Sequence, residues 1–295
     1  EPLMAMDTVK ATVEYARSIE KEHNKCFRFT ITTNGVLLDD ENIAYINREM
    51  SNAVLSLDGR KEVNDDLRPT VNGKGSYDVI VPKFKKLIEG RGTKDYYLRG
   101  TFTRFHKDFA EDVKALAAIG KHVSVEPVVG KEDDPYALQE ADLPELKAEY
   151  ERLAEYLKDH RETNFFHFNV DLAQGPCVIK RLRGCGAGCE YVAVTPDGDI
   201  YPCHQFVGNE DYKLGSVYDG TFAKELSSQF AALNIYTREE CSHCWARFYC
   251  SGGCSASNLL VNGDIKHPHK VGCELERKRL ECAIALRALA AGMAE

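Results

Sequence analysis

Two kinds of hydrophobic pattern alternate along roughly the first 175 residues of the chain. In residues 6–24 apolar side chains recur at helical spacing, and in residues 26–33 they alternate with polar ones. The same reading predicts helices at 6–24, 39–50, 76–90, 108–120 and 143–160. It predicts extended segments at 26–33, 53–58, 96–103, 121–129 and 164–170. Strands separated by helices of this length predict right-handed crossovers and a parallel sheet, either open or closed into a barrel.

The ends of the predicted strands carry small and polar residues. In such folds the ligand-facing edge lies at the carboxyl ends of the strands. The residues at these ends are Thr33, Asn34 and Gly35; Ser56, Asp58 and Gly59; Thr101, Thr103 and Arg104; and Glu126 and Pro127. They suit a ligand-binding rim, and ordinary strand-to-helix loops have the same composition.

The pattern changes from about residue 176 onward. A hairpin is expected at 191–203, a short extended segment at 213–217, and helices at 221–234 and 273–293. Apolar residues are sparse between these elements, so metal–ligand bonds are expected to supply part of the folding free energy. The sequence therefore predicts two domains, residues 1–175 and 176–295.

Cysteine is the unusual residue in this second part. Ten of the eleven cysteines lie between residues 177 and 282, and residues 241–254 read CSHCWARFYCSGGC. An odd number of cysteines in a chain of 295 residues does not suit the closed disulfide set of a small secreted domain. Eight cysteines could hold two structural zinc ions or two iron–sulfur clusters, since each takes four thiolates. Redox-active CxxC thiols are the third alternative, and they lack their usual setting at a helix end.

Charge and hydropathy exclude other classes. The net charge is −8, from 38 basic and 46 acidic side chains, which argues against a nucleic-acid-binding surface. No apolar run approaches the roughly 20 residues of a membrane span, and no signal peptide is visible. We therefore expect no nucleic-acid partner, no membrane and a cytoplasmic location. The opening EPLMAMDTVK has no initiating methionine at position 1, and we expect an upstream segment to be missing.

The spacing of these cysteines resembles that of the SPASM domain, the C-terminal extension of radical S-adenosylmethionine enzymes that modify peptides and proteins. The matching stretches are GDIYPC at 198–203, LGSV at 214–217 and CSGGC at 250–254, with a final Cys273. In the first part, Glu1-Pro2 resembles the end of the family's GGEP motif. TTNG at 32–35 and SLDG at 56–59 resemble the ends of its third and fourth strands. The resemblance implies an α/β fold, a partial (β/α)6 radical SAM barrel followed by a cysteine-rich SPASM domain with a small β-hairpin and helices.

The resemblance implies two auxiliary [4Fe–4S] clusters with interleaved ligands. One would take Cys185, Cys189, Cys203 and Cys254, and the other Cys241, Cys244, Cys250 and Cys273. Only three residues separate Cys185 and Cys189, and the first cluster is hypothesised to leave one iron open for a substrate thiolate. Cys26, Cys177 and Cys282 receive no role, and burial is the plain explanation for the last two.

Residues for S-adenosylmethionine are carried over in the same way. Glu1 and Pro2 would hold the amino group of its methionine, and Ser56 and Asp58 would lie near the ribose. Thr33 and Asn34 belong to the same rim. Arg68 would pair with the carboxylate, with Arg99 a weaker choice of the same kind. The CxxxCxxC loop that holds the third [4Fe–4S] cluster does not occur in the chain, so the 295 residues alone are expected to be inactive.

Within the superfamily the chain is most similar to the SCIFF peptide maturases. The stretch CGAGCEYVAVTPDGDIYPCHQFVG carries this subgroup resemblance. It implies a Cys-to-Thr thioether installed in a ribosomally made Cys-rich precursor peptide, in the sactipeptide or ranthipeptide class. An electron donor such as ferredoxin or flavodoxin, in the cytoplasm of an anaerobe, is implied as well. His204 occupies the place of the aspartate proposed as the base in sulfatase-maturing relatives, and it is either a proton acceptor or packing beside the cluster.

Three other readings remain open. The chain could belong to another SPASM enzyme, such as a sulfatase-maturing type. It could be a zinc-stabilised binding module without catalysis, or an electron-transfer protein that uses two clusters as a relay. Metal content separates the zinc module from the others.

Overall fold

The computed structural model describes residues 1–131, 133–170 and 182–292. These residues form two compact units. The first contains Glu1–Val128 and Ala148–Asn169, and the second contains Val129–Lys147 and the chain from Val170 onward. Among the described residues, no helix is both long and apolar enough to cross a bilayer.

A five-stranded parallel sheet forms the centre of the first unit. Its order is β1-β2-β3-β4-β5, and every neighbouring pair is parallel. The strands are β1 (Thr30–Thr33), β2 (Asn52–Ser56), β3 (Asp95–Phe102), β4 (His122–Pro127) and β5 (Asn164–Phe165). The fold class expected from the sequence, a parallel α/β sheet with a separate cysteine-rich part, is confirmed.

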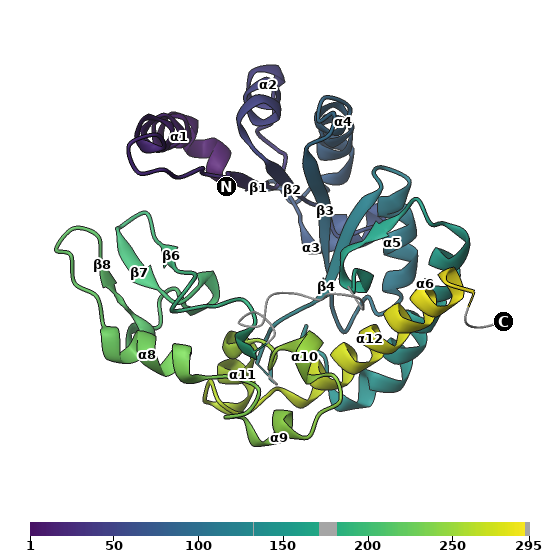
Figure 1. The fold of residues 1–295 in the computed structure, drawn as a ribbon. Coiled ribbons are helices and arrows are strands. Elements are labelled where there is room, and N and C mark those ends of the chain that lie inside the picture. Colours follow the sequence, from purple (N-terminus) through teal and green to yellow (C-terminus); the bar gives the residue numbers. More distant parts are fainter. Residues whose placement is uncertain (132, 171–181, 293–295) are drawn as a thin grey trace. The chain divides into compact units, whose positions relative to one another are not determined.

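Helices connect the strands and follow one another along one side of the sheet (Figure 1). They are α1 (Met6–Ile19), α2 (Asp40–Glu49), α3 (Lys61–Leu67), α4 (Tyr77–Glu89), α5 (Phe109–Ala117) and α6 (Leu143–Asp159), with short 3-10 turns η1 (Pro2–Ala5), η2 (Glu140–Asp142) and η3 (Phe166–Phe168). The inward face of α4 carries Ile80, Phe84 and Leu87, which are almost fully buried.

The two faces of the sheet differ in character. Along β3, Tyr96, Leu98 and Phe102 are buried, whereas Tyr97 and Arg99 between them are not. Side chains alternate across a strand, so one face packs on the helices and the other is polar and more open. The polar face can therefore hold a ligand.

Two predicted strands are shorter than expected. The segment 26–33 pairs only over Thr30–Thr33, so the placement of Cys26 in a strand is wrong. Side chains at the end of α1 form hydrogen bonds with the backbone of Phe27. Its N–H donates to Glu20 Oε1 at 2.7 Å, and its carbonyl accepts from Arg17 at 3.0 Å. The segment 164–170 is a strand only at Asn164–Phe165, because the chain turns into η3 directly afterwards.

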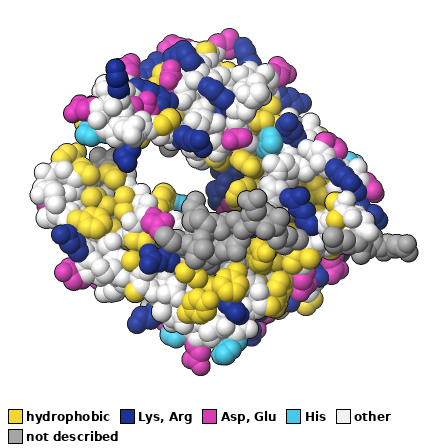
Figure 2. Space-filling view, in the orientation of Figure 1, with side chains coloured by type: hydrophobic (Ala, Val, Ile, Leu, Met, Phe, Trp, Pro, Cys, Tyr) yellow, Lys and Arg dark blue, Asp and Glu magenta, His cyan; other side chains and the backbone are white. Residues whose placement is uncertain are grey.

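The second unit contains a three-stranded antiparallel sheet of order β6-β7-β8, and its strands are β6 (Ala193–Val194), β7 (Asp199–Tyr201) and β8 (Gly215–Ser216). The expected hairpin at 191–203 is confirmed by the β6–β7 pair. This sheet and its loops leave large apolar side chains exposed, among them Val194, Val217 and Tyr218. Figure 2 shows hydrophobic side chains, in yellow, gathered on the surface at the left of the view, where this sheet lies.

Helices and 3-10 turns make up the rest of this unit. They are η4 (His204–Phe206), η5 (Glu210–Tyr212), α8 (Lys224–Ala232), α9 (Glu239–Ser242), α10 (Arg247–Cys250), α11 (Ser255–Asn262) and α12 (Lys270–Ala290). The C-terminal helix begins at Lys270, three residues before the predicted start at Cys273. One small buried cluster holds the sheet and α8 together, with Phe206 and Phe230 in edge-to-face contact at 5.5 Å.

Candidate functional site

Glu1 lies at the carboxyl end of β1, beside the rim that the sequence predicts. Its carboxylate accepts a hydrogen bond from Thr33 Oγ1 at 2.8 Å and another from the Asn34 backbone N–H at 2.8 Å. It also accepts from the N–H of Leu3, and Pro2 opens the short η1 turn that follows. The structure thus brings together Glu1, Thr33 and Asn34, which come from different parts of the sequence.

Asp58 and Arg68 form a bidentate ion pair just beyond the end of β2. Arg68 donates from Nε to Asp58 Oδ2 at 2.5 Å and from Nη2 to Oδ1 at 3.1 Å. The Thr101 N–H on β3 donates to the same carboxylate at 2.8 Å. Asp58 is buried, and a matched fork of this kind is the strong form of the pair. The guanidinium expected to face a ligand carboxylate therefore faces Asp58.

Arg99 belongs to a polar row on the open face of the sheet. It donates to Glu126 Oε2 at 2.7 Å, and its register neighbours are Ser56 on β2 and Ser124 on β4. Ser124 Oγ lies 3.2 Å from Nε2 of His167, which follows β5. The row therefore crosses three adjacent strands, β2, β3 and β4, and ends at η3. Sequence reasoning missed Ser124 and His167, although the polar alternation in residues 121–129 carries the signal for Ser124.

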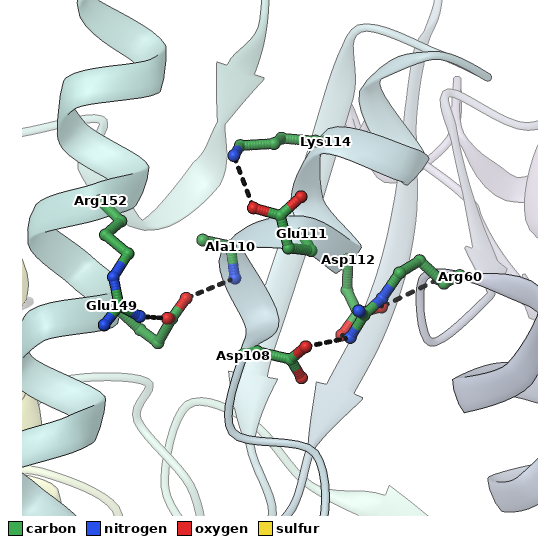
Figure 3. Close-up of polar contacts among 8 residues, drawn as sticks. All are labelled: Arg60, Asp108, Ala110, Glu111, Asp112, Lys114, Glu149 and Arg152. Carbon is green, nitrogen blue, oxygen red and sulfur yellow. Dashed lines mark hydrogen bonds and ion pairs between the residues drawn. The ribbon is translucent and has the colours of Figure 1, made fainter.

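A second ionic network fixes the turn after Asp58 (Figure 3). Arg60 donates from Nε to Asp112 Oδ1 at 2.8 Å, and its backbone N–H donates to the same oxygen at 2.9 Å. Arg60 also pairs with Asp108 at 2.8 Å. Burial raises the pKa of Asp112, and the Asp112 hydrogen bond is the largest contribution that raises the pKa of Arg60. Nearby, buried Glu149 accepts from the Ala110 N–H at 3.3 Å, at the start of α5.

Three thiols of the first predicted ligand set are neighbours. Burial raises the pKa of Cys203, and the thiols of Cys254 and Cys185 raise it further. Cys189 instead donates to the carbonyl of Gly186 at 3.4 Å. The Cys203 thiol thus interacts electrostatically with the thiols of Cys185 and Cys254.

The four thiols of the second predicted set also gather. Burial raises the pKa of Cys250 to about 12 and that of Cys273 to about 11. Cys273 interacts electrostatically with Cys241 and Cys244, and Cys250 interacts with Cys273. Arg277, one turn along α12 from Cys273, donates to Cys244 Sγ at 3.9 Å.

These two groups fit iron–sulfur clusters better than single ions. Across the described residues, no three cysteine, histidine or acidic side chains converge closely enough to hold one metal ion. A four-iron cluster separates its ligands more widely than one tetrahedral ion does, and it uses thiolates alone. Both predicted donor sets consist of thiols alone.

The remaining candidates are scattered. His204 begins η4 directly after Cys203, and its side chain is exposed to solvent rather than packed. Cys26 is exposed, Cys282 is buried in α12, and Cys177 lies outside the described residues.

Comparison with known proteins points to one class. The SPASM family, described as an iron–sulfur cluster-binding domain, matches residues 185–245. An uncharacterized protein of Archaeoglobus fulgidus is 26% identical over 98% of this chain and 67% of its own length. The cysteine-type anaerobic sulfatase-maturating enzyme of Clostridium novyi is 23% identical over 85% of this chain and 70% of its own. The mycofactocin maturase MftC of Mycolicibacterium smegmatis is 27% identical over 87% of this chain and 64% of its own.

Solved structures agree on the fold. The structure described as native anSMEcpe with bound AdoMet and a peptide superposes with a TM-score of 0.76 at 19% identity, covering 99% of this chain and 83% of that one. Streptococcus suis SuiB bound to its precursor peptide SuiA gives 0.57 at 18% identity, covering 82% and 58%. The chain thus has the fold of radical SAM maturases and contains a SPASM iron–sulfur domain. Auxiliary [4Fe–4S] clusters and S-adenosylmethionine are the cofactors of this class.

Proposed function

We propose that this chain is the cluster-bearing part of a radical SAM peptide maturase. The enzyme would install a Cys-to-Thr thioether in a ribosomally made Cys-rich precursor peptide. The proposal rests on the match of residues 185–245 to an iron–sulfur cluster-binding family. The electrostatic interactions of Cys203 with Cys185 and Cys254, and of Cys273 with Cys241, Cys244 and Cys250, support it. The relatives that mature peptides and sulfatases support the broader class, and the thioether rests on the resemblance in residues 185–208.

The eight cysteines would hold the two auxiliary clusters. The first would use Cys185, Cys203 and Cys254, with Cys189 either as fourth ligand or displaced. The second would use Cys241, Cys244, Cys250 and Cys273. Because the Cys189 thiol donates to a backbone carbonyl, we place the entry of a substrate thiolate at the first site. S-adenosylmethionine and the third cluster of the intact protein would supply the oxidant for the threonine carbon, and the auxiliary clusters would accept the remaining electron.

Residues of this chain would position S-adenosylmethionine at the carboxyl ends of the parallel strands. Glu1 is already oriented by Thr33 and Asn34, so its carboxylate is fixed where an ammonium group could bind. Arg68 would act mainly through Asp58, holding that carboxylate next to Ser56 at the end of β2. Arg99, which lies on the polar face beside Glu126, is the better placed guanidinium for a ligand carboxylate.

His204 would serve as the proton acceptor for the substrate thiol. It directly follows the ligand Cys203, and its exposed imidazole is open to a peptide. Replacing it with alanine should slow product formation while leaving the iron content unchanged.

The test uses the intact polypeptide, reconstituted anaerobically with iron and sulfide. It is given S-adenosylmethionine, reduced flavodoxin as electron donor and a Cys-rich precursor peptide. We expect a product lighter by two hydrogen atoms, with fragmentation showing a bond from cysteine sulfur to threonine. The same peptide with serine in place of each cysteine is the matched control and should remain unmodified. Oxidation of a cysteine to an aldehyde would instead establish a sulfatase-maturating activity, which the Clostridium relatives make the second candidate.

A further inference from the structure

Arg238, at the start of α9, is buried with a side chain that reaches into the cysteine-rich centre of the second unit. Only 5% of the residue is exposed. Its guanidinium donates to the carbonyl of Gly252, to Ser255 Oγ at 3.2 Å and to the carbonyl of Ile265 at 3.1 Å. All three acceptors are neutral.

The charge of Arg238 is unbalanced within the described residues. No carboxylate of that part of the chain lies within ion-pair distance of it, and its buried Nε has no hydrogen-bond acceptor there. Leaving a buried charge without a counter-charge costs several kcal/mol. Arg91, an equally buried arginine in the first unit, differs because its Nε donates to the Asp95 carbonyl at 3.1 Å. Arg238 therefore needs an anionic acceptor that the polypeptide itself does not supply.

The cysteines around Arg238 show where that anion would lie. Burial lowers the pKa of Arg238, and the thiols of Cys241, Cys250, Cys254 and Cys273 oppose that effect. Cys254 belongs to the first predicted ligand set, and the other three belong to the second. The guanidinium thus contacts both sets electrostatically, with most of its neighbours in the second. A four-thiolate cluster is anionic, and it becomes more so when reduced.

We propose that Arg238 is the buried counter-cation of the auxiliary clusters and donates its Nε–H to a sulfur of the second cluster. This inference rests on the proposed assignment of the eight cysteines. A nearby positive charge and an N–H···S hydrogen bond stabilise the reduced cluster more than the oxidised one, so Arg238 raises the reduction potential. Arg238 is a positioning and tuning residue, since it touches the cofactor and not the peptide.

Arg277 provides an internal comparison on the same cluster. It also donates to a cysteine sulfur, that of Cys244, at 3.9 Å. Unlike Arg238, however, it has a carboxylate partner, Glu274, which it shares with Lys147. Removing Arg277 should therefore change the local charge less than removing Arg238.

The experiment is an EPR-monitored redox titration of the intact protein and its variants, after iron and sulfide have been counted in each. Arg238→Gln should shift the reduction equilibrium of the second cluster at least tenfold toward the oxidised form, which is 59 mV for one electron. Arg238→Lys keeps the positive charge and loses the Nε–H donor of the guanidinium, so it should lower the reduction potential of the second cluster by less. Arg277→Gln should shift the reduction potential by less than Arg238→Gln does. Arg91→Lys, in the other unit, should not shift it.

The outcomes separate this inference from the proposed function. Wild-type protein without iron and sulfide would contradict the function before any variant is made. Wild-type potential in a fully loaded Arg238→Gln protein would overturn the role of Arg238. If the glutamine variant does not retain its clusters, full loading of the lysine variant shows that the positive charge is needed, and loss of the clusters from both refutes the charge argument. An unchanged potential in the loaded lysine variant refutes the Nε–H···S hydrogen bond.

Discussion

The Asp58–Arg68 ion pair at the rim of the sheet should contribute measurably to the stability of the fold. Replacing Arg68 with methionine leaves a buried carboxylate with only the Thr101 N–H. We expect a loss of about 3 kcal/mol in the free energy of unfolding, the lower end for a broken buried pair, because Arg68 itself is partly exposed. Urea denaturation measures it. The matched control is Lys86→Met, which removes an exposed pair with Asp40 and should cost below about 1 kcal/mol. Equal losses in the two variants would refute the buried-pair account.

Asp264 and His267 form a surface pair with a measurable pH signature. The Asp264 hydrogen bond raises the pKa of His267, and His267 lowers the pKa of Asp264 to about 2. The raised histidine pKa stabilises the fold below about pH 6.5, and this contribution is lost as the pH rises through the folded value. The lowered aspartate pKa stabilises above about pH 4 and is lost as the pH falls toward 2. NMR titration of the intact protein should show His267 titrating above its usual value, and Asp264→Asn should bring it back. An identical titration curve in both proteins would contradict the pairing.

At the level of single residues, the sequence predicted which residues lie at the rim of the sheet but not which side chains pair with one another there. Glu1, Thr33 and Asn34 could be placed together because a motif resemblance and the parallel topology put them at one edge. The Asp58–Arg68 pair could not be foreseen, since a guanidinium in a loop has many carboxylates within reach. His167 was missed because its segment predicts an ordinary strand, and only tertiary contact with Ser124 shows its position.

The turn between β2 and α3 depends on a glycine. Gly59 has a φ of +125°, and an added Cβ would lie 2.3 Å from Asp112 Cβ, against the Arg60–Asp112 network. Gly59→Ala should therefore cost about 2–5 kcal/mol from backbone strain and overpacking together. Gly73→Ala is the matched control, because Gly73 has a φ of +74° and open space around it, so about 1–2 kcal/mol is expected. Equal costs, measured by thermal unfolding, would show that Asp112 does not restrict the turn.

At the level of elements, long periodic segments were predictable and short ones were not. The helices α2, α4, α5 and α6 fall within their predicted ranges because each buries one apolar stripe. The helices α3, α9 and α10 have four to seven residues, too few for a periodic signal. The strand predicted at 26–33 is too long because the apolar alternation begins before the pairing does. The side chains of Arg17 and Glu20 form the hydrogen bonds of the Phe27 backbone, so these groups do not pair with a neighbouring strand.

Across the whole molecule, the two ligand sets should behave as independent cluster sites. Cys203→Ala and Cys250→Ala should each remove about four of eight iron atoms, and the double variant nearly all of them. Cys26→Ala is the control, since this exposed cysteine lies outside both sets and its loss should leave the iron content unchanged. Loss of all iron from either single variant would show one shared site instead of two.

The division into residues 1–175 and 176–295 stays a prediction, and each part has its own physical basis. The first part has enough buried apolar surface for a helix-covered sheet, and the second has a small core and many cysteines. The sequence does not state which metal completes that second part, because zinc and iron–sulfur sites share their ligands. The match of residues 185–245 to an iron–sulfur cluster-binding family favours clusters.

The most direct test is the amount of iron, sulfide and zinc bound to the 295-residue chain after its anaerobic purification. The account predicts about eight iron and eight sulfide, two four-iron clusters held by eight cysteines. Two zinc ions and no sulfide would contradict it and leave a zinc-stabilised protein.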